Sequence, residues 1–177
     1  SSVSIDDRAM ACQAVAYLLQ SGHRRVAVFG GSRMEGDNLS LRYLGVLDAF
    51  RRIGQTFDET RYVETRFSME GAFEAAKTFF RQRPDTTAVF CMSDAMALGV
   101  IRALKDLGRD VPQDVSVFGF DGTEMGKYFI PRLTTVEQPV AAIARESLRV
   151  LADMMERGAP PQNVVLKAEL RLRDSVR

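Results

Sequence analysis

The chain of 177 residues contains no tryptophan and one histidine, His23. Catalytic sites of the Ser-His-Asp or Cys-His kind need a histidine beside the nucleophile, at the edge of a sheet where the strands end. His23 instead follows a helix-ending glycine and leads into the first predicted strand, which places it at the opposite edge. We therefore expect a local capping or packing role for His23 and no enzymatic activity.

The chain also lacks an excess of positive charge and long apolar runs, which excludes further classes of function. The 24 basic and 23 acidic residues nearly cancel, so the chain lacks the excess positive charge that holds a nucleic-acid backbone. No apolar run approaches the roughly 18 residues that span a bilayer, and the N-terminus does not resemble a secretion signal. We expect a cytoplasmic protein that neither crosses a membrane nor binds DNA through this part of its sequence.

Motifs for cofactors and metals are missing as well. Cys12 and Cys91 lie far apart without zinc-type spacing, which indicates buried, reduced thiols. The sequence has no Walker loop, no Gly-x-Gly-x-x-Gly motif and no metal-spaced cluster. We expect neither a cofactor nor a metal.

Short β-branched runs alternate with amphipathic helical stretches along the chain. This alternation predicts an α/β fold, a parallel sheet flanked by helices on both faces. Gly22, Gly54 and Gly108 end three of the predicted helices. The predicted strands occupy residues 26–29, 62–67, 88–92, 115–120 and 164–172, and the last predicted helix covers residues 139–157.

Polar residues gather where the predicted strands end. In open parallel sheets ligands bind beyond the carboxyl ends of the strands, and Arg42, near the start of the second helix, points toward the same crevice. Carboxylate and amide oxygens, a guanidinium group and a flat ring suit a sugar or a similar polyol. Besides Arg42, the residues at this edge are the loop 32–38, Phe67, Ser93, Asp94, Asp121 and Gln138.

Each of these residues also has an ordinary structural interpretation. Ser93 and Asp94 are suited to cap the helix that follows them. Asp121 precedes a glycine, where aspartate commonly forms a turn. Phe67 could be a core residue, and Arg42 could pair with an acidic side chain of the preceding loop. Their convergence on one edge of one sheet favours a ligand site.

The sequence resembles the LacI/GalR family of bacterial repressors over almost its whole length. The resemblance rests on the order and spacing of several segments together, since each one alone is modest. These segments are Gly-His-Arg-Arg-Val-Ala (22–27), Arg-Tyr-Leu-Gly (42–45), residues 84–90, Ser-Asp-Ala-Met-Ala-Leu-Gly (93–99), residues 111–121, Pro-Arg-Leu-Thr-Thr-Val (131–136) with Gln138, and Leu-Arg-Leu-Arg-Asp-Ser (170–175).

The resemblance implies a domain organisation. Residues 1–136 would form the C-terminal lobe of a periplasmic-binding-protein-like effector domain of type I. Residues 137–163 would supply a crossover helix that packs on an N-terminal lobe, most of which is absent here. Residues 164–177 would form the returning terminal strand. The helix-turn-helix headpiece of the family is not in this sequence, so operator DNA would be bound through that missing part.

The resemblance also implies a function and a site. The chain would sense a small sugar-like metabolite for a repressor that acts as a homodimer. The family's effector-contacting positions match Asn38, Arg42, Phe67, Ser93, Asp121 and Gln138. One position departs from the family, which commonly has asparagine where this chain has Ser93, so no particular sugar is carried over. The alternatives are a periplasmic sugar-binding protein of a transporter and a flavodoxin-like enzyme or phosphate-binding module.

Overall fold

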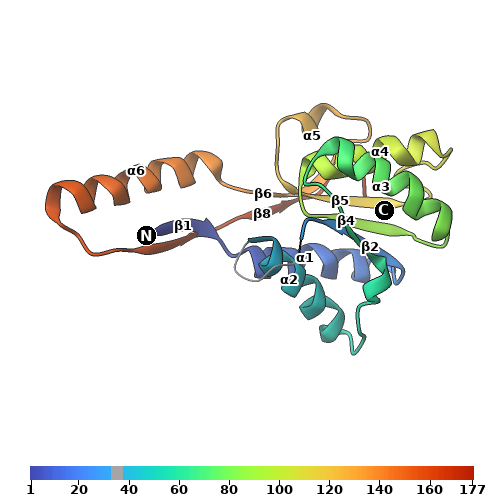
Figure 1. Ribbon diagram of the computed structural model, residues 1–177, viewed down its shortest axis with the longest axis horizontal. Coiled ribbons are helices and arrows are strands. Elements are labelled where there is room, and N and C mark those ends of the chain that lie inside the picture. Colours follow the sequence, from blue (N-terminus) through green and yellow to red (C-terminus); the bar gives the residue numbers. More distant parts are fainter. Residues whose placement is uncertain (33–37) are drawn as a thin grey trace.

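The computed structural model describes residues 1–32 and 38–177. Figure 1 shows a wide body, built from a sheet with helices on both sides, and a narrow extension formed by α6 (Val140–Arg157), β1 (Ser2–Ile5) and β7 (Asn163–Leu166). The chain leaves the body for the extension after β6 (Thr134–Glu137) and returns to it at β8 (Glu169–Arg171). The predicted α/β architecture is confirmed.

Six strands form the sheet of the body within the described residues, in the order β3-β2-β4-β5-β6-β8. All neighbours are parallel except β8, which pairs antiparallel with β6. The central strands are buried along almost their whole length, as continuous apolar runs between two helical layers should be. These strands are β2 (Val26–Gly30), β4 (Ala88–Cys91) and β5 (Ser116–Asp121), with β3 (Tyr62–Glu64) at one edge.

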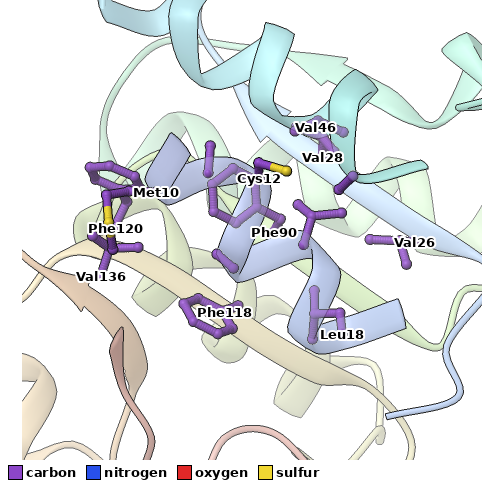
Figure 2. Packing of buried hydrophobic residues seen from close by; sticks show 14 of the residues in the cluster. Met10, Cys12, Leu18, Val26, Val28, Val46, Phe90, Phe118, Phe120 and Val136 are labelled. Atoms are coloured by element: carbon purple, nitrogen blue, oxygen red, sulfur yellow. The ribbon is translucent and has the colours of Figure 1, made fainter. Parts of the chain in front are cut away.

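Helices cover both faces of this sheet because consecutive strand residues point to opposite sides. Val28 packs with α1 (Asp7–Gln20) and α2 (Asn38–Arg52), as Figure 2 shows from close by. Phe29, the next residue, packs on the other side with α3 (Met69–Gln82) and α4 (Asp94–Asp106). Cys12 and Cys91 are free and buried, and burial raises the pKa of the Cys91 thiol well above its ordinary value.

Two predicted strands are longer than the real ones. The strand predicted over 62–67 ends at Glu64, and a short 3-10 helix, Glu59–Arg61, precedes it. The single strand predicted over 164–172 is wrong, because the chain there passes from β7, which pairs with β1, to β8, which pairs with β6. Hydrophobic periodicity reports which residues are extended but not which sheet they join. A short helix, α5 (Met125–Tyr128), lies between β5 and β6.

His23 lies at the end of the sheet where the strands begin. Its ring nitrogens are within hydrogen-bond distance of Thr87 Oγ1 (3.1 Å) and Ser116 Oγ (3.0 Å). The ring is buried, and burial lowers its pKa. The local packing role expected for His23 agrees with this arrangement.

The extension differs from the body in what it leaves exposed. Val150 of α6 is buried, while Leu148, Leu151 and Met155 on the same helix are 53–77% exposed. The helix packs against β1, and these apolar side chains have no cover within the described residues. Neither α6 nor any other described helix combines the length and apolarity needed to cross a membrane.

Candidate functional site

The structure brings Arg42 and Asp121 together, although they are 79 positions apart in the sequence. Arg42 lies on the first turns of α2, and Asp121 is the last residue of β5. Arg42 Nη1 is 3.8 Å from Asp121 Oδ1. Both residues therefore lie at the sheet edge that the sequence analysis selected.

Arg42 is held from three sides. Its Nε donates a 2.7 Å hydrogen bond to Asp7 Oδ1, and its Nη1 donates to the main-chain oxygen of Met92. Its guanidinium carbon lies 3.7 Å from the centre of the Phe120 ring, which is a cation–π arrangement. Arg42 is 6% exposed as a residue. A guanidinium held by these contacts presents its remaining donors in a fixed geometry.

Asp7 is the residue of this cluster that the sequence analysis missed. Either Asp6 or Asp7 could cap the start of α1, and Asp6 does so by accepting a 2.8 Å hydrogen bond from Ala9 N. Asp7 is therefore free to turn inward, where it is 2% exposed and pairs with Arg42. The sequence did contain a signal for this role, because two adjacent aspartates stand at the start of the helix. A helix needs only one residue as its N-cap, so the other aspartate is available for a different partner.

Asp121 has an unusual backbone conformation. Its φ of 125° lies in a region that residues other than glycine rarely adopt. Gln138 holds it from the neighbouring strand end, because Gln138 Nε2 donates to Asp121 Oδ1 at 2.8 Å and Gln138 N donates to the Asp121 carbonyl at 3.1 Å. The side chain of Asp121 is 32% exposed, so one side of its carboxylate faces out of the cluster.

Burial raises the pKa of Asp121 to about 6, and the negative charge of Asp94 adds to this rise. The Arg42 charge, the Gln138 amide and the backbone amide of Asp94 act in the opposite direction. Burial has the largest effect because it penalises the charged form. Asp121 is thus mostly ionised at pH 7.5, when it accepts hydrogen bonds, and mostly neutral at pH 5.

Phe67 and Ser93 occupy different environments. Phe67 is 46% exposed in the connection between β3 and α3. A side chain at Gly31 would come within 3.9 Å of its ring, so the ring lies beside the end of β2. Ser93 is 2% exposed, and its Oγ accepts a 3.2 Å hydrogen bond from Met96 N as the cap of α4. Its hydroxyl is already used within the protein.

Asn38 is the first residue of α2 and is exposed. Most of the predicted loop 32–38, residues 33–37, lies outside the described residues. One connected cluster is thus formed by Arg42, Asp121 and Gln138. Phe67 and Asn38 are exposed side chains outside this network of bonds. Among the described residues no group of three or more metal-ligating side chains occurs.

Comparison with known proteins places this arrangement in a family. A model of the periplasmic binding protein-like domain matches residues 15–176. The regulator MalR of Clostridium butyricum is 34% identical over 179 aligned positions, which cover 99% of this chain and 52% of MalR. The repressor CytR of Escherichia coli is 36% identical, over 88% of this chain and 45% of CytR.

The chain belongs to the family of periplasmic binding protein-like domains found in LacI-type regulators. Its fold matches that of the regulator CelR in complex with cellobiose, with a TM-score of 0.93 and 33% identity over 99% of this chain and 54% of that one. A LacI-family regulator from Enterococcus faecium with bound ribose gives 0.91 and 26%, over 98% of this chain and 64% of that one.

The LacI/GalR resemblance seen in the sequence is therefore confirmed. This LacI-type domain spans about half the length of the curated relatives that it matches. Its fold class follows from the family and from the sheet described above.

Proposed function

We propose that the chain is the effector-sensing part of a LacI-type transcriptional repressor and that it binds a small sugar-like metabolite. The observation that carries the proposal is the convergence of Arg42, Asp121 and Gln138 at the carboxyl end of the sheet. That edge is where ligands bind in open parallel sheets. The cellobiose complex of CelR and the ribose-bound regulator from Enterococcus faecium support a sugar as ligand.

Each residue would have its own task in sugar recognition. Ionised Asp121 accepts hydrogen bonds from hydroxyl groups, and Gln138 and Arg42 orient its carboxylate. The exposed ring of Phe67 offers an apolar face on which a sugar ring stacks. Asn38, at the start of α2, supplies a further amide. Ser93 would contribute no hydrogen bond to the sugar, because its hydroxyl caps α4. Its side chain is smaller than the asparagine common in the family, and the space left by this difference would be its contribution to the site.

The extension supports a second lobe. We propose that residues 1–136 form one lobe, residues 137–163 cross over to the other, and residues 164–177 return. The exposed apolar side chains of α6 would pack on the second lobe, since apolar surface of this kind marks an interaction site. A ligand that binds better when the lobes are closed shifts the equilibrium toward closure.

The remaining parts of the proposal concern the whole protein. It would act in the cytoplasm as a homodimer, bind operator DNA through a helix-turn-helix headpiece, and have no catalytic activity. The relatives reported above are transcription regulators, and no observation favours a transporter's binding protein. Sedimentation of the intact regulator tests the homodimer, and a turnover screen tests the absence of catalysis.

The function is tested by a thermal-shift screen of sugars on the intact regulator, because a ligand that prefers the native state raises Tm. Replacing Asp121→Ala should weaken binding of the sugar found, by at least about tenfold, because a hydrogen bond to a charged group is lost. Asp106→Ala, an exposed carboxylate near the far end of α4, is the matched control and should leave affinity unchanged. Equal affinities of the Asp121→Ala variant and the unaltered regulator would contradict the proposal.

A further inference from the structure

Asp94 is a fully buried carboxylate next to the proposed site. It is 0% exposed and begins α4, directly after the Ser93 cap. Because Ser93 already caps the helix, the Asp94 side chain is available for other partners. A buried carboxylate must be hydrogen-bonded to offset the cost of removing it from water.

Both oxygens of Asp94 have partners, and these come from two different segments. Asp94 Oδ2 accepts hydrogen bonds from Thr123 N at 2.6 Å and from Thr123 Oγ1 at 3.0 Å. Asp94 Oδ1 accepts one from Thr135 Oγ1 at 2.5 Å. The single carboxylate therefore ties the start of α4 to the turn after β5 and to β6.

The turn after β5 is the one that carries Asp121. Thr123 is two residues beyond Asp121, and Gly122 between them has a φ of 75°. A side chain at Gly122 would lie 2.6 Å from Glu137 Cα, so the turn packs tightly on the end of β6. The φ of 125° at Asp121 is costly by itself and persists only when surrounding bonds impose it.

The sequence also leaves room for Asp94. Gly119 lies in β5, and a Cβ there would collide with Asp94 Oδ1 and approach Leu133 Cδ2 to 2.9 Å. The backbone amide of Asp94 also acts on the Asp121 carboxyl. The side chain of Asp94 thus faces the turn after β5.

We propose that Asp94 is a positioning residue of the effector site, which holds Asp121 toward Arg42 by anchoring Thr123 and Thr135. The inference rests on the proposed function. Asp94 itself would not touch the effector, because its two oxygens are occupied and buried.

Two measurements without any sugar test this role in the intact regulator. The first is hydrogen–deuterium exchange of the amides of residues 121–123, and the second is titration of the Asp121 carboxyl by carbon-13 NMR. In Asp94→Asn we expect exchange of this turn to rise at least about tenfold, because its anchoring bonds are weakened. The pKa of Asp121 should fall from about 6 toward its ordinary value near 4, since the neighbouring charge is gone and water reaches the carboxylate.

The matched control is Ser175→Ala. Ser175 is also fully buried, and its Oγ bridges Thr134 N and the Val117 carbonyl near the ends where β5 and β6 begin. This variant should lower the stability of the protein. It should change neither the exchange of residues 121–123 relative to other turns nor the pKa of Asp121. Equal changes in both variants would show a general loss of stability and overturn the inference.

Thr123→Ala separates anchoring from charge. It removes the hydroxyl donor but keeps the Asp94 charge, and since Thr123 is exposed it disturbs little packing. We expect smaller changes in the same direction. Unchanged exchange and unchanged titration in Thr123→Ala and Asp94→Asn would overturn the inference, and Thr123→Ala alone decides if Asp94→Asn does not fold.

Calorimetry with cellobiose and with ribose forms a separate arm. If either sugar binds, Asp94→Asn should weaken it while Ser175→Ala does not. If neither sugar binds the unaltered regulator in this arm or in the wider screen, the proposed function fails. The exchange and titration results still decide on the role of Asp94.

Discussion

Two helices of the same chain, α4 and α6, show how different the body and the extension are. Both carry apolar side chains at helical spacing. In α4 those side chains are buried between the sheet and α3, whereas in α6 Leu148, Leu151 and Met155 are exposed. The comparison teaches that an apolar stripe shows a helix has a partner surface, but not whether that surface belongs to the same part of the protein.

The same contrast applies to ion pairs. The Arg42–Asp7 pair of the body is buried, with side chains 8% and 3% exposed. The Arg149–Glu146 pair on α6 lies along one helix, with Arg149 49% exposed. Burial removes the competition from water, so the first pair should matter for stability and the second should not.

The largest expected effect comes from breaking the buried pair. Asp7→Ala should lower the free energy of unfolding by about 4 kcal/mol, because Arg42 keeps its burial and loses its nearest carboxylate. Glu146→Ala on α6 should give no measurable change. Urea denaturation followed by circular dichroism measures both, and similar losses in the two variants would contradict the comparison.

Apolar truncations should give a somewhat smaller difference. Leu104 of α4 is fully buried, so Leu104→Ala should cost about 3 kcal/mol in the 177-residue chain. Leu148 of α6 is 68% exposed, so Leu148→Ala should leave the stability of this chain almost unchanged. In a longer protein that contains the proposed second lobe, Leu148→Ala should become destabilising if that lobe covers α6. An equal, small effect in both contexts would argue against that cover.

The smallest expected effect is a gain in the free energy of unfolding rather than a loss, and it comes from a replacement in the candidate site. Because the folded-state pKa of Asp121 is about 6, above the unfolded value near 4, ionising it disfavours folding once the pH rises past about 4. The cost grows until about pH 6 and is complete above it. Asp121→Asn should therefore stabilise the chain at pH 7.5 by on the order of 1 kcal/mol, allowing for the partial exposure of the group.

The gain should vanish near pH 4, where the unaltered Asp121 is neutral in the folded state and largely neutral in the unfolded one. Thermal unfolding at pH 4 and pH 7.5 measures it. A gain that is independent of pH would mean that burial does not raise the Asp121 pKa. A stabilising replacement at Asp121, a residue of the proposed site, would also fit a site optimised for function rather than stability.

Much of the body could be predicted from local sequence. Continuous apolar runs indicated β2, β4 and β5, and the polar residues that follow them indicated the edge where Arg42 and Asp121 meet. A cap residue also predicted a helix start, since Ser93 caps α4 as its position suggests. These features depend on neighbours within a few residues, so the sequence carries them directly.

What only the tertiary structure decided involves partners far apart in the chain. The division of residues 164–172 between two sheets depends on β1 and β6, and the pairing of Arg42 with Asp7 depends on how α1 and α2 pack. The tie from Asp94 to Thr123 and Thr135 spans 29 and 41 positions. The amino-acid order by itself determined most elements, their burial and the sheet edge that carries the candidate site, because propensity and periodicity are local. The bonds that orient the site arise only when distant segments are brought together.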